Sequence, residues 1–485
     1  MKSIFKSTAI LGSSSAISAV VGLVSAKLWA IMVGPAGLGY LTMQQSLLGL
    51  IVMVAGLGVS TGIVRLGAKA IADDDKLEIA ANQKAAIIIS MTTGAVGVAL
   101  LILFRNAINQ TLLEGNGSGG EVALLGAALV FTLLASTFSG ILNAHHNIKA
   151  LAKIAVLNSV LNASVLLVCV WAWHVQGIIV GIIISSLLNC LASYYFFKRE
   201  VKTEWIAVPR EKLLETINRL LRFGIPFTGS MLVGTGVQLI LPILILHQLD
   251  LESVGFYRAA STIAITSLAL VTTAMGQDYY PRLSAASDNP QELTTIVNQQ
   301  QYLLFVLISP IILWLLFLSP IVVPLLYTSK FSYSAEILNW FLVGDIFRLL
   351  SWTLSFVILA RSKSSLYFFI EFIGGITSLL TSLIGMQLFG VRGLGISYLV
   401  TYFVYYLLVW FLIRRQVKLK YSRENKMLIY FTLTSAVGIS VLTALGNEIF
   451  RNGFAIVVCF ISVIISFSIV KNKFFYEVPE QKRSI

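Results

Sequence analysis

Stretches of about 20 mostly apolar residues recur along almost the whole chain, and this pattern limits the possible folds more than any other feature. A helix of about 20 apolar residues is long enough to cross the hydrocarbon core of a bilayer. Hydrophobic residues make up 57% of the chain and charged residues 12%, which leaves no sizeable soluble domain. We therefore predict an all-α polytopic membrane protein of about 14 transmembrane helices, at approximately 7–33, 39–66, 84–103, 121–144, 153–173, 176–197, 221–246, 255–280, 301–319, 334–360, 365–388, 392–413, 427–445 and 452–470.

The formal net charge of +13 reflects the orientation of these helices. Most Lys and Arg residues lie in loops on one predicted side, above all in 198–219, 414–426 and 471–483. Loops rich in Lys and Arg stay on the cytoplasmic side of a membrane. The sequence therefore predicts a multi-pass protein of the cytoplasmic membrane with both termini in the cytoplasm. It contains no basic, aromatic-rich surface segment, so we expect no nucleic acid partner.

Residues that typically carry enzyme chemistry are scarce. The three cysteines, Cys169, Cys190 and Cys459, lie inside apolar stretches without the spacing of a metal site or a disulfide framework. The four histidines lie near loops, and there is no paired-carboxylate site, HExxH motif or GxxxxGK loop. We expect neither an enzyme nor a bound cofactor or metal.

The longest cytoplasmic connection has the pattern of an amphipathic helix. Pro209 precedes an apolar stripe at helical spacing that continues to Leu221. One interpretation is a helix that lies on the inner membrane surface. The other is an N-terminal extension of the seventh span.

The chain resembles itself at a fixed distance of 216 residues. Residues 175–178 (Val-Gln-Gly-Ile) match 391–394 (Val-Arg-Gly-Leu), and Gly39-Tyr40 matches Gly255-Phe256 at the same shift. Such a shift carries one six-helix segment onto the next, as in transporters built from parallel repeats. We therefore predict an N-lobe at 1–205, a C-lobe at 206–420 that begins with the amphipathic helix, and two appended helices without counterparts at 421–485.

Lys27 is the only charged residue inside the first span. A charge at membrane depth costs about 2.5–3.5 kcal/mol on insertion scales, so it usually faces protein, water or substrate. Its counterpart at the 216-residue shift is Ile243, so this cation belongs to one lobe only. Lys27 either faces a cavity between the lobes as a substrate contact or extends to the outer surface.

Arg65 and Arg282 lie at corresponding helix ends, with a slip of one residue in the repeat. They either anchor the protein to lipid headgroups or form the inward mouth of a cavity. The first half of the chain has no carboxylate at membrane depth. A cavity with a cation and no acid in one lobe would attract an anion.

Four charged residues of the second half are candidates for ion coupling. Asp345 and Arg348 are three residues apart on one predicted helix, where they can also form a purely structural pair. Asp278 and Glu371 are candidates for a coupling-proton or sodium site.

Two turn motifs resemble those of Wzx-type polysaccharide flippases. Residues 34–40 (Gly-Pro-Ala-Gly-Leu-Gly-Tyr) are similar to the GP-x-G-x-G-Y turn after the first span of that family. Residues 320–327 (Pro-Ile-Val-Val-Pro-Leu-Leu-Tyr), with Phe331 and Ala335, resemble its turn after the ninth span. The resemblance extends over essentially the whole chain, including the lysine of the first span and the two appended helices.

This resemblance implies the fold of the multidrug/oligosaccharidyl-lipid/polysaccharide exporter superfamily, in which two six-helix lobes form a V that opens alternately to either side. It implies a flippase that moves undecaprenyl-pyrophosphate-linked oligosaccharide across the bacterial inner membrane for assembly of O-antigen-like surface polysaccharide. Membrane lipids are further expected partners, and polysaccharide polymerase and chain-length proteins are compatible ones.

The resemblance also assigns roles to individual residues. Lys27 would pair with the pyrophosphate as a point charge, and Arg65 and Arg282 would be further cations of the substrate path. Amide side chains could bind sugar hydroxyls; the candidates by residue type are Gln44, Gln45, Asn158, Asn162 and Gln238.

Other transporter classes remain open. A cation-coupled drug or metabolite antiporter of the same fold would depend on Asp278, Asp345 or Glu371. A flippase for the peptidoglycan precursor would be expected to carry more arginines in spans one and two. A membrane glycosyltransferase or polymerase would need a large loop with catalytic acids, which the sequence lacks.

Overall fold

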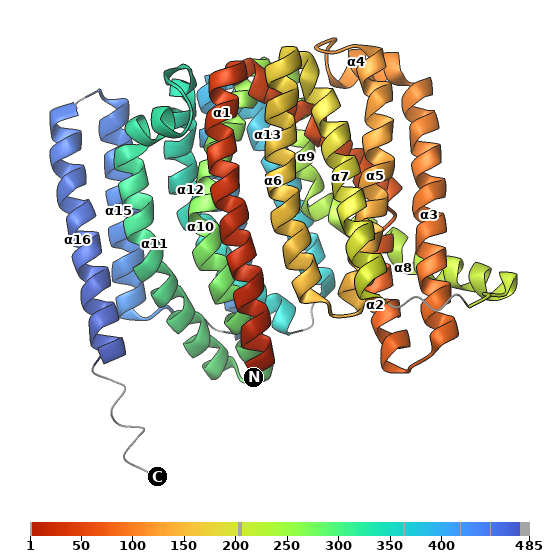
Figure 1. Ribbon diagram of the computed structural model, residues 1–485. Coiled ribbons are helices and arrows are strands. Elements are labelled where there is room, and N and C mark those ends of the chain that lie inside the picture. The colour runs from red at the N-terminus through yellow and green to blue at the C-terminus, as the bar shows by residue number, and fades with distance from the viewer. Residues whose placement is uncertain (1, 202–205, 362–363, 418, 447, 476–485) are drawn as a thin grey trace. The chain divides into compact units, whose positions relative to one another are not determined.

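The computed structural model describes residues 2–201, 206–361, 364–417, 419–446 and 448–475, and these residues are almost entirely helical (Figure 1). By packing, the chain divides into two compact units. Unit 1 comprises Met1–Gly255 with Leu326–Thr328, and unit 2 comprises Phe256–Leu325 with Ser329–Ile485.

The helices of unit 1 are, in chain order, α1 (Lys2–Ala55), α2 (Val59–Ala72), α3 (Lys76–Leu103), α4 (Arg105–Leu112), α5 (Gly119–Ala144), α6 (Ile148–Trp173), η1 (His174–Gln176), α7 (Gly177–Glu200), α8 (Arg210–Gly234) and α9 (Gly236–Gln248). Helix α10 (Leu251–Ala285) begins in unit 1. It continues in unit 2, which also contains α11 (Pro290–Leu326), η2 (Ser329–Phe331), α12 (Ser332–Ala360), α13 (Ser364–Phe389), α14 (Val391–Val417), α15 (Arg423–Ala444) and α16 (Glu448–Phe475).

Packing places α8 and α9 in unit 1, because both contact helices of the first half: α8 contacts α2 and α3, and α9 contacts α1. The packing boundary therefore lies at Gly255, beyond the lobe boundary of residue 205 that the repeat predicts. The units describe how the helices pack, whereas the lobes describe the sequence repeat. The lobes at 1–205 and 206–420 remain a prediction.

The number of apolar helices agrees with a protein that spans the membrane about fourteen times. In the described part of the chain, ten helical stretches are long and apolar enough to cross a membrane, and two bent helix pairs raise this number to twelve. Two of the ten, Ile17–Ala55 and Ile148–Glu200, each overlap two predicted spans, which brings the total to fourteen; the predicted span 39–66 is interrupted between Ala55 and Val59. At about 1.5 Å per residue, the 53 residues of the longer stretch are far too long for one crossing of a core of about 30 Å.

The first two spans are joined within α1 by a kink at Gly34. This glycine has φ 63° and ψ −166°, and Pro35 follows it. A residue with a side chain rarely adopts this conformation, and proline cannot donate a backbone hydrogen bond to the preceding turn. The Gly-Pro pair of the first turn motif therefore ends one span and begins the next.

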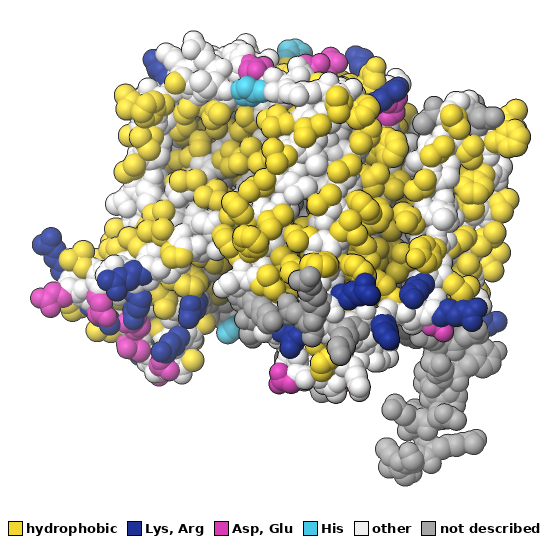
Figure 2. Space-filling model, turned by 180° about the vertical axis from the view of Figure 1, so that it is seen from behind, with side chains coloured by type: hydrophobic (Ala, Val, Ile, Leu, Met, Phe, Trp, Pro, Cys, Tyr) yellow, Lys and Arg dark blue, Asp and Glu magenta, His cyan; other side chains and the backbone are white. Residues whose placement is uncertain are grey.

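Hydrophobic side chains cover most of the middle of the helices in Figure 2, and charged side chains gather at their ends.

Helix bounds reproduce the 216-residue repeat. Shifting α6 (Ile148–Trp173) by 216 gives 364–389, which are the bounds of α13 (Ser364–Phe389). The same shift carries the end of α5 at Ala144 onto the end of α12 at Ala360.

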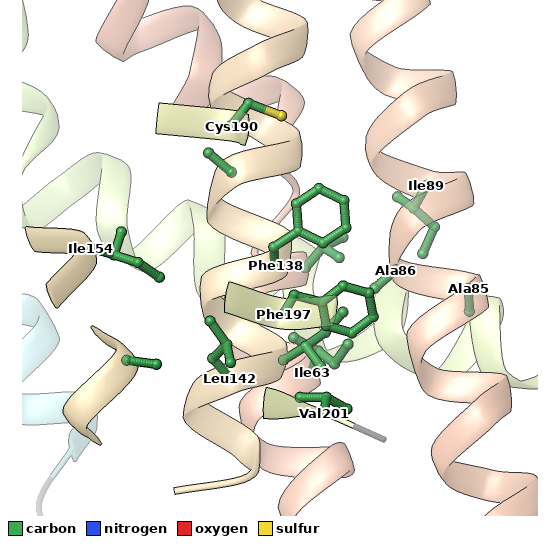
Figure 3. Close-up of a cluster of buried hydrophobic side chains, with 14 of the residues drawn as sticks. Ile63, Ala85, Ala86, Ile89, Phe138, Leu142, Ile154, Cys190, Phe197 and Val201 are labelled. Carbon is green, nitrogen blue, oxygen red and sulfur yellow. The ribbon is translucent and has the colours of Figure 1, made fainter. Parts of the chain in front are cut away.

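The two hydrophobic cores are also related by this shift. In unit 1 a buried cluster includes Ile63 on α2, Phe138 on α5 and Phe197 on α7 (Figure 3). In unit 2 the corresponding cluster includes Tyr279 and Leu354. Seven core positions of unit 1 have their counterparts, 216 residues later, in the core of unit 2: Ile63 and Tyr279, Phe138 and Leu354, Ile141 and Val357, Leu142 and Ile358, Ile154 and Ile370, Phe197 and Ile413, Val201 and Val417.

Glycines mark close helix approaches that recur in both halves. A Cβ atom at Gly177 would overlap the backbone of Cys169, and one at the equivalent Gly393 would overlap Gly385, the equivalent of Cys169. The turn from α6 to α7 and the turn from α13 to α14 therefore have the same close packing.

A second pair of glycines forms a reciprocal contact. A Cβ atom at Gly39 would overlap the carbonyl oxygen of Leu251, and one at Gly255 would overlap that of Pro35. Under the 216-residue shift, Pro35 corresponds to Leu251 and Gly39 to Gly255. Each copy of the motif thus packs against the other through the same two positions.

Of the two appended helices, α15 corresponds in part to α8 under the 216-residue shift, and the assignment of 421–485 as a segment outside the repeat remains a prediction. Shifting α15 back by 216 places its start at 207, close to the start of α8 at Arg210. Thr216 on α8 and Thr432 on α15 are equivalent, both are fully buried, and each donates to the carbonyl four residues earlier at 2.8 Å. The similarity escaped the sequence comparison because few other side chains match.

Candidate functional site

Lys27 is held by backbone at the end of another helix. It lies on α1 before the Gly34 kink, is half-buried, and its Nζ donates to the carbonyl oxygen of Tyr327. Tyr327 is buried and directly follows α11, where unpaired carbonyls give a helix end partial negative charge. The structure thus brings the lysine of the first span to the last residue of the second turn motif, 320–327.

The five candidate amides lie on helices that touch each other in unit 1. Gln44 and Gln45 are on α1, Asn158 and Asn162 on α6, and Gln238 on α9, and α1 contacts both α6 and α9. Gln238 is exposed, and Gln45, Asn158 and Asn162 are half-buried. Gln44 is fully buried, so a sugar could reach it only after these helices move.

Arg65 and Arg282 have different surroundings. Arg65 is exposed in the middle of α2, not at a helix end, with its guanidinium 4.9 Å from the centre of the Phe223 ring on α8. Arg282 is also exposed, but it forms an ion pair with Asp278 at 3.3 Å and donates to Gln299 at 3.1 Å. The charge of Arg282 is therefore balanced within its own helix, whereas Arg65 rests on an aromatic ring, an arrangement that leaves its positive charge in place.

Asp345 and Arg348 form a buried polar cluster with two tyrosines in unit 2. Asp345 is fully buried, and its carboxylate accepts from the Tyr398 hydroxyl at 2.7 Å and from Arg348 at 3.4 Å. Arg348 also donates to Tyr398 at 3.2 Å and lies 5.8 Å from the centre of the Tyr402 ring. Both hydrogen bonds to Asp345 end on Oδ1, and its buried Oδ2 has no hydrogen-bond partner among the described residues.

Glu371, the remaining coupling candidate, lies on α13 and accepts from the Tyr405 hydroxyl on α14 at 2.6 Å. The tyrosine partners of both carboxylates, Asp345 and Glu371, were not predicted from the sequence. Tyr398, Tyr402 and Tyr405 are four and three residues apart and so share one face of α14, but their spacing does not show which helices that face meets.

An ionic clamp between α3 and α8 was not predicted from the sequence. Glu78 on α3 forms ion pairs with Lys212 at 2.9 Å and with Arg219, both on α8. The segment before α8 is tied to the same helix, since Lys84 donates to the carbonyl oxygen of Ile206 at 3.0 Å. The clamp holds the first turns of the predicted amphipathic helix against unit 1.

In unit 2, amide groups take the place of this ionic clamp. Asn298 on α11 donates to the carbonyl of Lys420 at 2.9 Å and accepts from the backbone N–H of Ser422 at 2.8 Å. Asn425, at the start of α15, donates to the side-chain oxygen of Asn298 at 3.0 Å. Ser309 and Thr432 join the same two helices at 2.6 Å.

The turns after α5 and α12 carry different basic residues at equivalent positions. His145 directly follows α5 and Arg361 directly follows α12, and their backbone N–H groups bond to equivalent carbonyls, those of Ile141 and Val357. Burial lowers the pKa of His145, because the imidazolium loses hydration. The turn in unit 1 therefore favours a neutral imidazole where unit 2 has a permanent cation.

A family model described as "Polysaccharide biosynthesis protein" matches residues 4–287, which is more than half of the chain. The chain belongs to this family. Among curated relatives of this chain, the lipid III flippase of Escherichia coli (strain K12) is 21% identical over 412 residues, which cover 83% of this chain and 96% of that protein. A putative O-antigen transporter of Shigella flexneri is 24% identical over 189 residues, which cover 39% of this chain and 44% of that protein.

Solved structures of two transporter types share the fold of this chain. The lipid II flippase MurJ in an inward closed conformation aligns with a TM-score of 0.75 and 15% identity, covering 96% of this chain and 99% of MurJ. An inward-facing multidrug resistance MATE family transporter of the MOP superfamily aligns with a TM-score of 0.67 and 16% identity, covering 83% and 94%. At such low identity the similarity concerns the fold alone. The predicted exporter fold and the relation to polysaccharide flippases are confirmed.

Proposed function

We propose that this protein is a flippase that moves an undecaprenyl-pyrophosphate-linked oligosaccharide from the cytoplasmic to the outer leaflet of the bacterial inner membrane. The oligosaccharide would serve the assembly of an O-antigen-like surface polysaccharide, and transport would proceed by alternating access without a catalytic step. Membership in a family of lipid-linked oligosaccharide flippases supports this proposal, as does the lipid III flippase, whose sequence is related over almost its full length. The predicted cytoplasmic location of both termini is part of the proposal.

The observation that carries the proposal is the distribution of charge among the membrane helices. The helices of the first half contain Lys27 and Arg65 and no carboxylate at membrane depth. In unit 2, Arg282 and Arg348 each pair with a carboxylate of their own helix. Excess positive charge in the first half favours an anionic substrate such as a pyrophosphate over a cationic drug.

The contact of Lys27 suggests how the pyrophosphate could be received. Its ammonium donates to a neutral carbonyl, that of Tyr327. A hydrogen bond between an ammonium and a phosphate oxygen is stronger than one to a neutral carbonyl. A pyrophosphate that reached this position would therefore draw Lys27 away from Tyr327. Further contacts along the path would be Arg65 and Arg282. The sugar hydroxyls would be bound by amide side chains, namely Gln45, Asn158, Asn162 and Gln238. Gln44 would join them after the helices around it move.

The experiment that tests this role combines gene deletion with analysis of lipid-linked sugars in the host. Deletion should cause completed lipid-linked units to accumulate on the cytoplasmic face while surface polysaccharide is lost. In the deleted strain, Lys27→Ala should fail to restore display, and Lys27→Arg should largely restore it. Lys153→Ala, a change at an exposed lysine of α6, is the matched control and should behave as wild type. Normal display with a well-expressed Lys27→Ala protein would contradict the role of Lys27.

A cation-coupled antiporter of the same fold is the second candidate, and one observation favours it. Unit 2 contains Asp345, fully buried, and Glu371, half-buried, within apolar helices. Membrane-embedded carboxylates can carry coupling protons or sodium ions. An unchanged pool of lipid-linked sugars after deletion, together with altered drug sensitivity that depends on Asp345 or Glu371, would favour this candidate over the flippase.

A further inference from the structure

Helix α12 is buried on almost every side in unit 2, and its accessible residues are few. Between Phe341 and Ala360 every residue is buried except Phe347, Arg348, Trp352, Phe356 and Leu359. Arg348, Trp352 and Phe356 are spaced by four residues, so they lie along one side of the helix. These three residues are called the α12 stripe below.

The α12 stripe faces water rather than lipid, and the evidence is the position of Arg348. Its side chain is 34% exposed and lies near the middle of α12, well away from both helix ends. A charged side chain at this depth faces protein, a water-filled path or substrate, because its exposure to lipid is costly. Trp352 and Phe356, on the same side of α12, therefore border the same path.

Helix α10, which lies beside α12, holds the aromatic side chains of the stripe in place (Figure 1). The ring of Trp352 stacks on that of Tyr279 with 6.1 Å between the ring centres, and it meets Phe356 edge-on at 5.0 Å. Tyr279 is fully buried and donates to the carbonyl oxygen of Thr353 at 2.8 Å. Tyr280, the next residue of α10, is 42% exposed and meets Phe356 edge-on at 6.0 Å. Tyr280 thus extends the accessible aromatic surface beyond α12.

Arg348 offers hydrogen-bond donors to this surface without adding net charge. Asp345 pairs with it and balances its positive charge. Both hydrogen bonds that Arg348 forms with described residues, to Asp345 and Tyr398, start at Nη1. The N–H groups at Nε and Nη2 therefore remain available to a ligand. A neutral ligand with hydroxyl groups suits this surface better than an anion does.

We propose that the α12 stripe and Tyr280 bind a sugar ring of the transported lipid-linked oligosaccharide. A sugar ring has apolar C–H faces, which pack on aromatic rings, and hydroxyl groups around its rim, which can accept from Arg348. The stripe runs from the middle of α12 toward the helix end that is predicted to be cytoplasmic, the side from which the substrate would enter. The proposal rests on the flippase function proposed above and adds a sugar contact in unit 2, whereas the candidate amides all lie in unit 1.

The test measures ligand binding to the purified full-length protein in detergent by calorimetric titration. The probes are the oligosaccharide released by mild acid from the lipid-linked units of the deletion strain, and undecaprenyl pyrophosphate without sugar. Trp352→Leu and Phe356→Leu should each weaken binding of the released oligosaccharide about tenfold, as expected for loss of one aromatic contact. Binding of undecaprenyl pyrophosphate should stay unchanged. Trp352→Phe, which keeps an aromatic face, should keep most of the oligosaccharide binding.

The matched controls are Trp171→Leu on α6 and Phe369→Leu on α13, two exposed aromatic residues outside the stripe, and both should bind as wild type does. Equal affinity for the oligosaccharide in wild type, Trp352→Leu and Phe356→Leu would overturn the proposal and leave the flippase function standing. An equal loss of undecaprenyl pyrophosphate binding would also overturn it, because the residues would then act through the fold. A deletion strain without accumulated lipid-linked units would contradict the flippase function itself, and this proposal with it.

Discussion

The two halves of the repeat attach the next helix along the chain in the same place but by different chemistry. In unit 1, α8 is held on α3 by Glu78 with Lys212 and Arg219. In unit 2, α15 is held on α11 by the amide of Asn298. The helices are equivalent, but one junction depends on charge and the other on neutral hydrogen bonds. The repeat thus preserves the packing of a helix while the residues that secure it change.

The largest loss of stability should follow substitution of Gly39 or Gly255, the two glycines of the reciprocal contact. Comparing the two substitutions tests whether the two halves of the repeat are equivalent at this contact. In Gly39→Ala and Gly255→Ala, the new Cβ atom would overlap backbone atoms, which no side-chain rotation can relieve. Each should cost about 3 kcal/mol or more of stability. The measurement is unfolding of the detergent-solubilised protein, and Gly229→Ala, with nothing within 4 Å of the new atom, is the control. A large effect at one glycine and none at the other would show that the contact is not reciprocal.

The amide junction should be the stronger of the two clamps. Asn298→Ala removes side-chain hydrogen bonds to Lys420, Ser422 and Asn425 and leaves their backbone and amide groups without these partners. We expect a loss of about 2 kcal/mol, since each such bond contributes about 0.5–1.5 kcal/mol. The loss should be the same at low and high salt. A salt-dependent loss would contradict the distinction between the clamps.

The ionic junction should respond less to mutation but should be sensitive to salt. Glu78→Gln removes the partner of Lys212 and Arg219, whose side chains are partly exposed. Partly exposed ion pairs contribute about 1 kcal/mol or less, and salt screens them. The stability difference from wild type should therefore shrink as salt is raised from about 0.05 to 0.5 M. A difference that persists unchanged in high salt would mean that Glu78 acts mainly through packing.

The smallest effect should be a pH dependence of stability that arises from His145, in the first half of the repeat, and not from Arg361, at the equivalent turn of the second half. Because burial lowers the pKa of His145, the unfolded chain binds more protons than the folded protein near the ordinary histidine pKa of about 6.5. Stability should therefore fall as the pH is lowered through this value, and His145→Gln should reduce that slope. Arg361→Gln, at the equivalent turn, should leave the slope unchanged. An identical slope in wild type and His145→Gln would exclude His145 as its source.

The sequence was sufficient to predict the class of fold and the repeat, because both depend on long-range regularities. Apolar stretches predicted the spans, and the shift between 175–178 and 391–394 also relates the helix bounds and core positions. The relation of α15 to α8 was missed, because it is visible mainly in the buried pair Thr216 and Thr432.

The candidate site was less predictable, because side-chain partners depend on which helices meet. Nothing in the sequence indicates that Lys27 contacts the carbonyl of Tyr327, 300 residues later, since backbone carbonyls have no sequence signature. The pairing of Asp345 with Arg348 was predictable from their spacing of three. The addition of Tyr398 required knowledge that α14 packs against α12.

The reciprocal contact between Gly39 and Leu251 and between Gly255 and Pro35 has a consequence for the origin of the chain. Two identical molecules that meet around a two-fold axis form contacts of this kind, in which each position on one partner recurs on the other. A half-length ancestor with this motif could therefore have paired with a second copy of itself through the same small residues. Joining two gene copies end to end would have kept that contact while freeing each half to acquire its own charges.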